Sequence, residues 1–216
     1  MIVPRKFLLR GKSALSRGGA NMSQKIFTSR YYTEKELESA GFRSLGRNIM
    51  IHDTINIYGV ENIEIGDNVR IDAFVSIIAT GFVKIRSYVH IGAYCLLSGG
   101  EGIIMEDFSG LSHGVKVYSR SDDYSGRYLT NPTVPKKYAH IQGGTVTLKK
   151  HVIVGAGSVI LPGVTIGEGS AVGALSLVTK SLPDWGIYFG LPAKRIKTRS
   201  RDLLDLEEQL LRETHR

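Results

Sequence analysis

Aliphatic residues recur at every sixth position along most of this chain. Four sets of three begin twenty residues apart, and after an interruption the pattern resumes at strict intervals of six. A helix would need apolar residues at a spacing of 3.6 and a half-buried strand at a spacing of 2, so neither element explains the pattern. A fixed period held this long indicates a repeat architecture. The marked positions are Leu45, Ile51, Ile57, Ile65, Ile71, Ile77, Ile85, Ile91, Leu97, Met105, Leu111, Val117, Leu148, Val154, Ile160, Ile166, Val172 and Val178.

A triangular prism satisfies this period, because each six-residue unit can form one short strand and one corner, and three units close a coil. We therefore predict an all-β fold, a parallel β-helix of about six coils over residues 31–200, with the marked residues stacked inside it. The fourth position after a marked residue is small or β-branched, as a narrow interior requires, at Val69, Val75, Val89, Cys95, Ser158, Val164, Ser170 and Ser176. Glycines that directly follow a marked residue are expected at tight bends, at Gly66, Gly92, Gly155, Gly167 and Gly173.

The twenty-residue interval predicts where a long loop leaves the prism. Because three six-residue units need only eighteen residues, each interval of twenty contains two extra residues. These fall after the third marked residue of each early coil, around Gly59, around Gly81 and at residues 98–102. One edge should therefore carry wide corners. The chain leaves after Val117 for residues 118–147, so this loop should project from the same edge. A long unpatterned loop inside a regular repeat is usually functional.

Two helices are expected outside the repeat. Residues 32–41 have Thr33 as a plausible N-cap, Glu36 at the third helical position and Gly41 as a stop. Residues 201–216 place leucines on a broad apolar face. Because a solenoid needs covered ends, we expect these helices to cap the prism.

Charge and cysteine content narrow the function classes. The formal net charge is +8, but residues 1–30 hold seven basic residues and no acid, which leaves about +1 for the rest. We interpret residues 1–30 as a basic flexible extension and residues 1–21 as lying outside the fold. Nucleic-acid binding is disfavoured, because the basic charge does not gather on the predicted fold. The single cysteine, Cys95, permits no intrachain disulfide, which fits a cytoplasmic protein.

Membrane and metal chemistry are also disfavoured. No apolar run approaches the ~18 residues that would suggest a membrane span. The six histidines show no short paired spacing, so we expect no metal site of the zinc β-helix kind.

Residues 154–174, together with Val178-Thr179-Lys180 and Gly190-Leu191-Pro192-Ala193-Lys194, resemble the hexapeptide-repeat acyltransferases. The similarity is greatest to the maltose/galactoside acetyltransferase branch and its relatives in surface-polysaccharide biosynthesis. The resemblance implies a left-handed β-helix and a homotrimer. It also implies that CoA lies in the groove between two prisms, while the long loop of one subunit reaches its neighbour.

The resemblance also places the co-substrate, acetyl-CoA. It puts the pantetheine arm against the backbone at Ala156 and Ala174, and Thr179 and Lys180 near the end of the groove. Lys194 and Lys197 match basic residues near the nucleotide phosphates, where cations pair with phosphate oxygens.

The catalytic base departs from the family pattern. The resemblance expects a histidine at the start of the loop, and Asp122 stands at that position. Asp122 or Asp123 is one candidate base, if its pKa is raised. His113 and His140 are the alternatives. No strong base is needed if the acceptor is an amine, because a deprotonated amine attacks a thioester without help.

Together these features predict an acyl-CoA-dependent O- or N-acetyltransferase acting on a sugar or nucleotide-sugar. Carboxylates, hydroxyls and aromatic rings in residues 122–132 suit a carbohydrate acceptor. The alternative is a non-catalytic β-helix scaffold that has lost the histidine.

Overall fold

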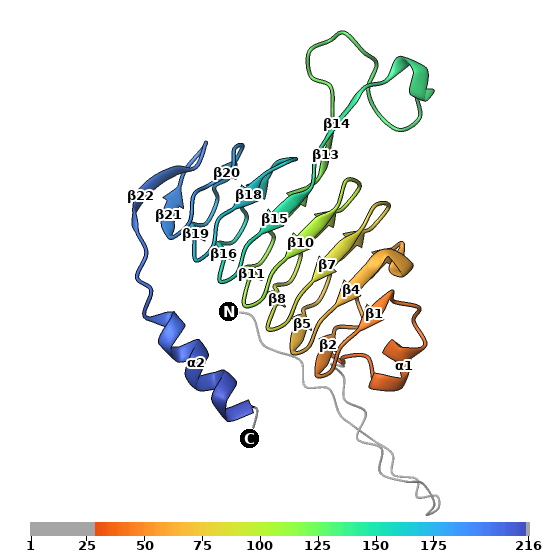
Figure 1. The fold of residues 1–216 in the computed structure, drawn as a ribbon. Helices are drawn as coiled ribbons and strands as arrows, with labels where there is room; N and C mark the ends of the chain where they lie inside the picture. Colours follow the sequence, from red (N-terminus) through yellow and green to blue (C-terminus); the bar gives the residue numbers. More distant parts are fainter. Residues whose placement is uncertain (1–28, 215–216) are drawn as a thin grey trace, which may run out of the picture.

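The computed structural model describes residues 29–214, so almost all of the expected basic extension lies outside the described residues. Short strands form three sheets, parallel except for the last strand of one of them, and these sheets are the three faces of a prism (Figure 1). Sheet 1 contains β1 (Ser44–Leu45), β4 (Ile63–Ile65), β7 (Val83–Ile85), β10 (Ile103–Met105), β15 (Val146–Leu148) and β18 (Thr165–Ile166). Sheet 2 contains β2 (Ile49–Ile51), β5 (Val69–Ile71), β8 (His90–Ile91), β11 (Gly110–Leu111), β16 (Ile153–Val154), β19 (Ala171–Val172), β21 (Gly186–Phe189) and β22 (Lys194–Thr198). Sheet 3 contains β3 (Asn56–Tyr58), β6 (Ser76–Ile78), β9 (Leu96–Ser98), β12 (Lys116–Tyr118), β17 (Val159–Ile160) and β20 (Leu177–Val178).

The marked aliphatic residues form the core, as predicted. All of them are buried except Leu45 and Ile57, which lie in the first coil and are half-buried. Equivalent residues of successive coils are register partners, for example Leu97 with Val117 and Val117 with Ile160. The fold is the expected left-handed parallel β-helix, and six complete coils are followed by a partial seventh.

Each coil has three corners, named here for the sheet that precedes them. Corner A follows a strand of sheet 1, corner B a strand of sheet 2 and corner C a strand of sheet 3. Most of the residues with positive φ lie in these corners, for example Asn68 at +57° and Gly157 at +68°.

The glycines that follow the marked residues have a different role from the one predicted. They are not the residues with positive φ. A Cβ on Gly155 would lie 2.4 Å from the backbone nitrogen of Ala174 in the next coil. These positions therefore need glycine because two coils approach closely, and the left-handed backbone conformation falls two residues later.

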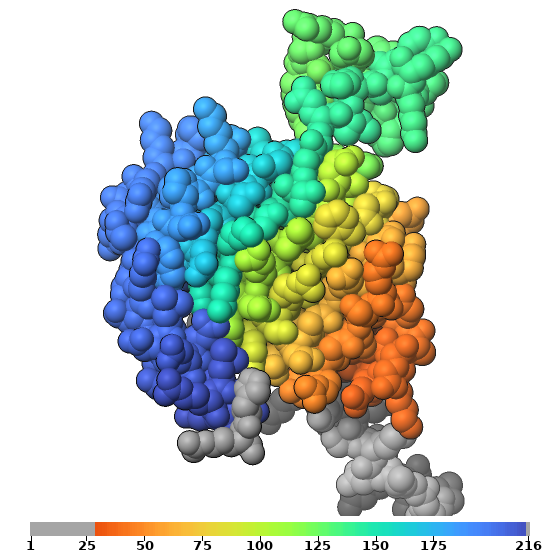
Figure 2. Space-filling view, viewed as in Figure 1, coloured from red at the N-terminus to blue at the C-terminus, as the bar shows by residue number. Residues whose placement is uncertain are grey.

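The long loop projects from corner C, as predicted, and stands clear of the prism (Figures 1 and 2). Its base is an antiparallel pair, β13 (Arg120–Asp122) with β14 (Ile141–Gly143), and it carries the short helix η2 (Lys136–Tyr138). The buried hydroxyl of Ser119 fixes the base, because it donates to the Ser98 carbonyl at 2.9 Å and accepts from the Glu101 N–H at 2.8 Å. Arg120 Nε also contacts Glu101 Oε1 at 2.8 Å.

The N-terminal helix caps the first coil as expected. Helix α1 (Glu34–Glu38) has the predicted capping box between Thr33 and Glu36, and Leu37 is buried in the core. Another short helix, η1 (Val60–Asn62), forms the wide corner C of the first coil.

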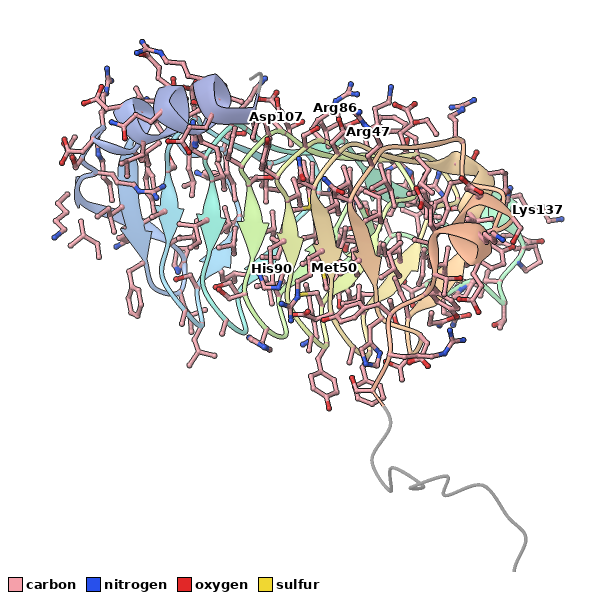
Figure 3. All side chains as sticks on the ribbon, turned by 90° about the horizontal axis from the view of Figure 1, so that it is seen from below. Arg47, Met50, Arg86, His90, Asp107 and Lys137 are labelled. Atoms are coloured by element: carbon pink, nitrogen blue, oxygen red, sulfur yellow. The ribbon has the colours of Figure 1, made fainter. Side chains whose placement is uncertain are left out.

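Helix α2 (Leu203–Thr214) does not cap the last coil, which corrects that expectation. It runs back along corner A, on the same edge of sheet 2 as Asp107, Arg86 and Arg47, whereas His90 and Met50 lie toward the other edge (Figure 3). A buried hydrogen bond holds the helix in this position, because Glu207 accepts from His151 at 2.9 Å and both side chains are buried. The hairpin of β21 and β22 covers the last coil instead.

Candidate functional site

Corner B brings three of the predicted site residues into one line. The carbonyl of His113 accepts from the Gly157 N–H at 2.9 Å, and the carbonyl of Ala156 accepts from the Leu175 N–H at 2.8 Å. His113, Ala156 and Ala174 therefore occupy equivalent positions in successive coils, and all three are exposed. Each of the three stands two residues after a marked residue of sheet 2, and those marked residues, Leu111, Val154 and Val172, are register partners.

The predicted phosphate-binding lysines lie near the C-terminal end of the prism. Phe189 packs directly above Gly173 at corner B, and its register partner in the hairpin is Lys194. Lys197 lies on the same strand, β22, and both lysines are exposed. Thr179 and Lys180 follow β20 and are exposed at corner C, on the far side of sheet 3 from Ala174. Within residues 29–214, no ion pair engages any of these three lysines.

The two candidate aspartates are adjacent in the loop but have different surroundings. Asp123 is buried, its Oδ1 accepts from the N–H of Ser125 at 2.7 Å and from the Ser125 hydroxyl, and its Oδ2 accepts from Gln142 Nε2 at 3.3 Å. The hydrogen bond from the Ser125 hydroxyl, followed by that from its N–H, holds the pKa of Asp123 below its ordinary value. Both oxygens of Asp123 are thus used to hold the loop together.

Asp122 is the more available carboxylate. It is half-buried at the end of β13, and its Oδ2 accepts one long bond, 3.4 Å, from the N–H of Asn131. His140 is exposed on the returning side of the loop, with its ring 5.0 Å from the ring of Tyr128.

One chain does not bring these candidates together. His113 lies at corner B, whereas Asp122 and His140 lie on a loop that leaves corner C and points away from its own prism (Figure 1). The loop exposes large apolar side chains, including Tyr124 at 91% and Leu129 at 58%. A site containing both corner B and the loop therefore requires a second copy of the chain.

Sequence reasoning missed a charged cluster on the outer face of sheet 2. Asp72 accepts from Arg70 Nε at 2.7 Å, and its other oxygen lies 2.8 Å from His90 Nε2. Burial raises the pKa of Asp72, but the hydrogen bonds with His90 and Arg70 outweigh it and leave the pKa below its ordinary value. The twenty-residue interval could have revealed this cluster in the sequence, because it makes Arg70 and His90 register partners.

A shallow groove of about 350 Å³ crosses sheet 2 beside this cluster. Its lining includes His90, Gly110 and His113, and Leu203 at the start of α2. A Cβ on Gly110 would meet only a carbonyl oxygen at 3.5 Å, so packing does not require the glycine, and its missing side chain leaves the groove open. A cavity of similar volume under α1 has Glu36 as its one charged lining residue, and Glu36 is already bonded to Arg30 and Thr33.

Residues 145–180 match the family described as bacterial transferase hexapeptide (six repeats). The chain is 43% identical over 178 residues to a dTDP-4-amino-4,6-dideoxy-D-glucose acyltransferase of Escherichia coli, a match that covers 82% of this chain and 93% of that protein. The chain belongs to the hexapeptide-repeat acyltransferases. It is an acyl-CoA-dependent enzyme acting on a sugar or nucleotide-sugar, so the scaffold alternative is not supported.

Further matches refine the branch. AntD, an N-acyltransferase from Bacillus cereus solved with dTDP and 3-hydroxybutyryl-CoA, is 47% identical, has a TM-score of 0.84, and covers 86% of this chain and 98% of its own. The galactoside O-acetyltransferase of Lactococcus lactis is 43% identical over 65 residues, or 29% of this chain and 31% of that protein. This galactoside O-acetyltransferase match is therefore local, whereas the similarity to AntD spans the fold.

Two further observations concern membranes and metals. No helix among residues 29–214 is long and apolar enough to cross a membrane. In the same range no three His, Cys, Asp or Glu residues are grouped so that they could hold a metal ion.

Proposed function

We propose that this protein transfers an acyl group, acetyl in the simplest case, from acyl-CoA to the 4-amino group of dTDP-4-amino-4,6-dideoxyglucose. The observation that carries this proposal is the similarity to the Escherichia coli acyltransferase over 93% of that protein's length. AntD supports it, because a variant of that enzyme was solved with dTDP-4-amino-4,6-dideoxyglucose and coenzyme A.

The acceptor chemistry agrees with the missing histidine. A deprotonated amine is a sufficient nucleophile for a thioester, whereas a hydroxyl with a pKa far above 7 needs a base. The amine nitrogen attacks the thioester carbon, the C–S bond breaks, and an amide forms. The attacking nitrogen loses a proton, which reaches the departing thiolate.

Asp122 is the group we propose to accept that proton. It is half-buried, ionisable and lightly bonded, and it occupies the loop position where the family resemblance expects a base. Asp123 is excluded from the role because both its oxygens are bonded within the loop and its pKa is lowered. His113 is the alternative, since it lies on the same line as Ala156 and Ala174.

We further propose a homotrimer whose sites lie between subunits. Corner B of one prism would supply His113 and the pantetheine contacts at Ala156 and Ala174, and the neighbour's loop would supply Asp122. Two features support this arrangement: the loop stands clear of its own prism, and its apolar side chains are exposed. Lys180 at corner C and Lys194 above corner B would then face the CoA phosphates from two sides of one seam.

The proposed acceptor also suggests a cellular setting. A nucleotide-sugar is an activated glycosyl donor, so its acylated product would feed a glycosyltransferase. We propose that the reaction takes place in the cytoplasm and serves surface-polysaccharide biosynthesis.

The test is a comparison of acceptors with purified protein. Thiol release from acetyl-CoA would be followed with dTDP-4-amino-4,6-dideoxyglucose and, as the matched hydroxyl acceptor, dTDP-glucose. We expect rapid release with the amine alone, and a product heavier by one acetyl group that resists hydroxylamine, as an amide does. The proposal would be refuted by release with dTDP-glucose but not with the amine, or by no release with either acceptor.

A further inference from the structure

The C-terminal end of the prism carries positive charge that is not paired with acidic side chains. β22 is the last strand in the order of sheet 2, so one of its edges has no partner strand, and it lies at the end of the prism (Figure 1). Residues 180–201, which include β22, hold six basic residues and one acid, Asp184. Within residues 29–214, no ion pair engages any of these six basic residues. We define the end patch as five exposed residues of this edge, Leu191, Arg195, Ile196, Lys197 and Arg201.

Two large aliphatic side chains belong to the end patch. Leu191 is 74% exposed and Ile196 is 64% exposed. Ile196 stands between Arg195 and Lys197 on β22, where the register of the hairpin shifts and leaves Ile196 without a partner on β21. The hairpin therefore presents an apolar side chain to solvent between two cations.

Binding of acyl-CoA does not account for the whole end patch. The proposed CoA contacts lie at the seam beside corner B, where Lys194 is the register partner of Phe189. Arg201 lies at the opposite edge of sheet 2, because its guanidinium lies over the ring of Trp185 at 5.0 Å, and Trp185 bonds through its N–H to the carbonyl of Glu168 in corner A. The basic surface thus spans the full width of the sheet, which a ligand at one corner does not need.

Protection of the open strand edge does not account for the end patch either. Charged side chains, lysine above all, keep edge strands from pairing with other chains. Exposed Leu191 and Ile196 on the same edge work against this protection. Pairing of two copies through β22 is disfavoured as well, because it would bring like charges together across the new strand pair. Cations mixed with aliphatic side chains fit a partner that is anionic at its surface and apolar beneath.

We propose that the end patch docks the protein onto an anionic membrane surface, with its three cations at the lipid phosphates and Leu191 and Ile196 at the boundary of the acyl chains. Attraction to anionic headgroups and burial of apolar side chains together hold peripheral proteins on membranes. Nucleic acid offers the same phosphates but no apolar phase for the aliphatic side chains. In the proposed homotrimer the end patch is repeated three times around one axis, so contacts that are weak in one subunit act together. The contact adds a location to the proposed reaction and does not depend on the choice of acceptor.

The test is flotation of the full-length protein with vesicles of phosphatidylcholine mixed with phosphatidylglycerol. We expect binding to these vesicles, none to phosphatidylcholine alone, and release at about 1 M salt, where the Debye length falls to about 3 Å. Each cation near an anionic membrane contributes about fivefold to affinity, so Arg195→Gln/Arg201→Gln should bind roughly 25-fold more weakly per subunit. Ile196→Ser should bind roughly tenfold more weakly, because it removes apolar area from the contact without changing the charge.

Lys35→Gln/Arg43→Gln is the matched control, because it removes two exposed cations from α1 and the segment before β1, at the other end of the prism (Figure 1). We expect its vesicle affinity to equal that of wild type. Residues 1–28 are present in every variant, so their basic residues affect all of them alike. All three variants should keep the wild-type kcat and KM with soluble substrates, which shows that each is folded.

Two results would overturn the membrane contact directly. One is wild-type protein that does not float with anionic vesicles, and the other is equal vesicle affinity of wild type, Arg195→Gln/Arg201→Gln and Ile196→Ser. Binding to a DNA duplex but not to vesicles, lost in the double arginine variant, would assign the end patch to nucleic acid and also overturn the proposal. Failure of the acceptor comparison would leave this result unaffected, because vesicle binding is measured without substrates.

Discussion

Replacing Gly155 with alanine should show how tightly the coils are stacked at corner B. The added Cβ would lie 2.4 Å from the nitrogen, and 2.8 Å from the Cα, of Ala174 in the next coil, and 2.7 Å from the carbonyl carbon of Gly173. All three are backbone atoms, so no rotamer change relieves the contact and the two coils must separate locally. Forced overpacking of this kind costs about 1–3 kcal/mol. With a slope of about 2 kcal/mol per molar urea, the unfolding midpoint should fall by roughly 0.5–1.5 M.

The assay is urea unfolding at one fixed protein concentration, together with the acyl-CoA KM. Because the strain falls on Ala174, where the pantetheine arm is expected, the acyl-CoA KM should rise as stability falls. Gly41→Ala is the control for a glycine in open space, since an added Cβ would meet only a side-chain carbon at 3.8 Å. Unlike Gly155, Gly41 has a positive φ, +87°, which by itself accounts for a small loss of stability in the alanine variant. We expect it to lower stability slightly and to leave the KM unchanged. Equal midpoints for Gly155→Ala and wild type would refute the close coil spacing.

Three further predictions concern the loop, the lysines and α2. Asp122→Asn should lower kcat on the order of a hundredfold, the scale of a lone general base, whereas Asp123→Asn should change steady-state kinetics only a few-fold, since asparagine still accepts from Ser125. Lys180→Ala and Lys194→Ala should raise the acyl-CoA KM with kcat unchanged at saturating acyl-CoA, and unchanged CoA affinity by calorimetry would contradict their placement. Burial raises the pKa of Glu207, but hydrogen bonds from Lys150 and His151 outweigh it and lower the pKa. Ionised Glu207 therefore stabilises the docked position of α2 above about pH 4.3, and this contribution is lost as the pH falls through the folded-state pKa. Hydrogen exchange of the α2 amides should become faster in acid relative to the rest of the prism. Glu207→Gln should remove this dependence on pH.

The fold was predictable because its information is local and periodic. Ile71, Ile91 and Leu111 each sit twenty residues from the next, and that interval alone stacks them in the core. The loop position followed from the same arithmetic, since the extra residues at Gly59 and Gly81 mark corner C. The path of α2 did not follow, because an apolar helix face does not specify which surface it covers. Its partner, His151, lies 56 residues from Glu207 in the sequence.

The site was predictable only in part. Motif resemblance predicts pantetheine contacts at Ala156 and Ala174, and the structure adds that His113 is aligned with these two positions. The different environments of Asp122 and Asp123 depend on the hydrogen bonds of Gln142 and Ser125, which adjacent residues of the same type do not reveal. The cluster of Asp72 and His90 forms across coils, so its members are near each other only after the prism has closed.

The most direct test of the account is subunit complementation, because the account builds each site from corner B of one subunit and the loop of its neighbour. Ala156→Trp would block the corner, Asp122→Asn would disable the loop, and each variant alone should be nearly inactive. In trimers assembled from an equal mixture, a site is intact when an Asp122→Asn subunit supplies the corner and an Ala156→Trp subunit supplies the loop. Random assembly places about one quarter of the sites in that state, so the mixture should recover about a quarter of wild-type activity. A mixture no more active than its two components would show that each site lies within a single chain and would contradict the account.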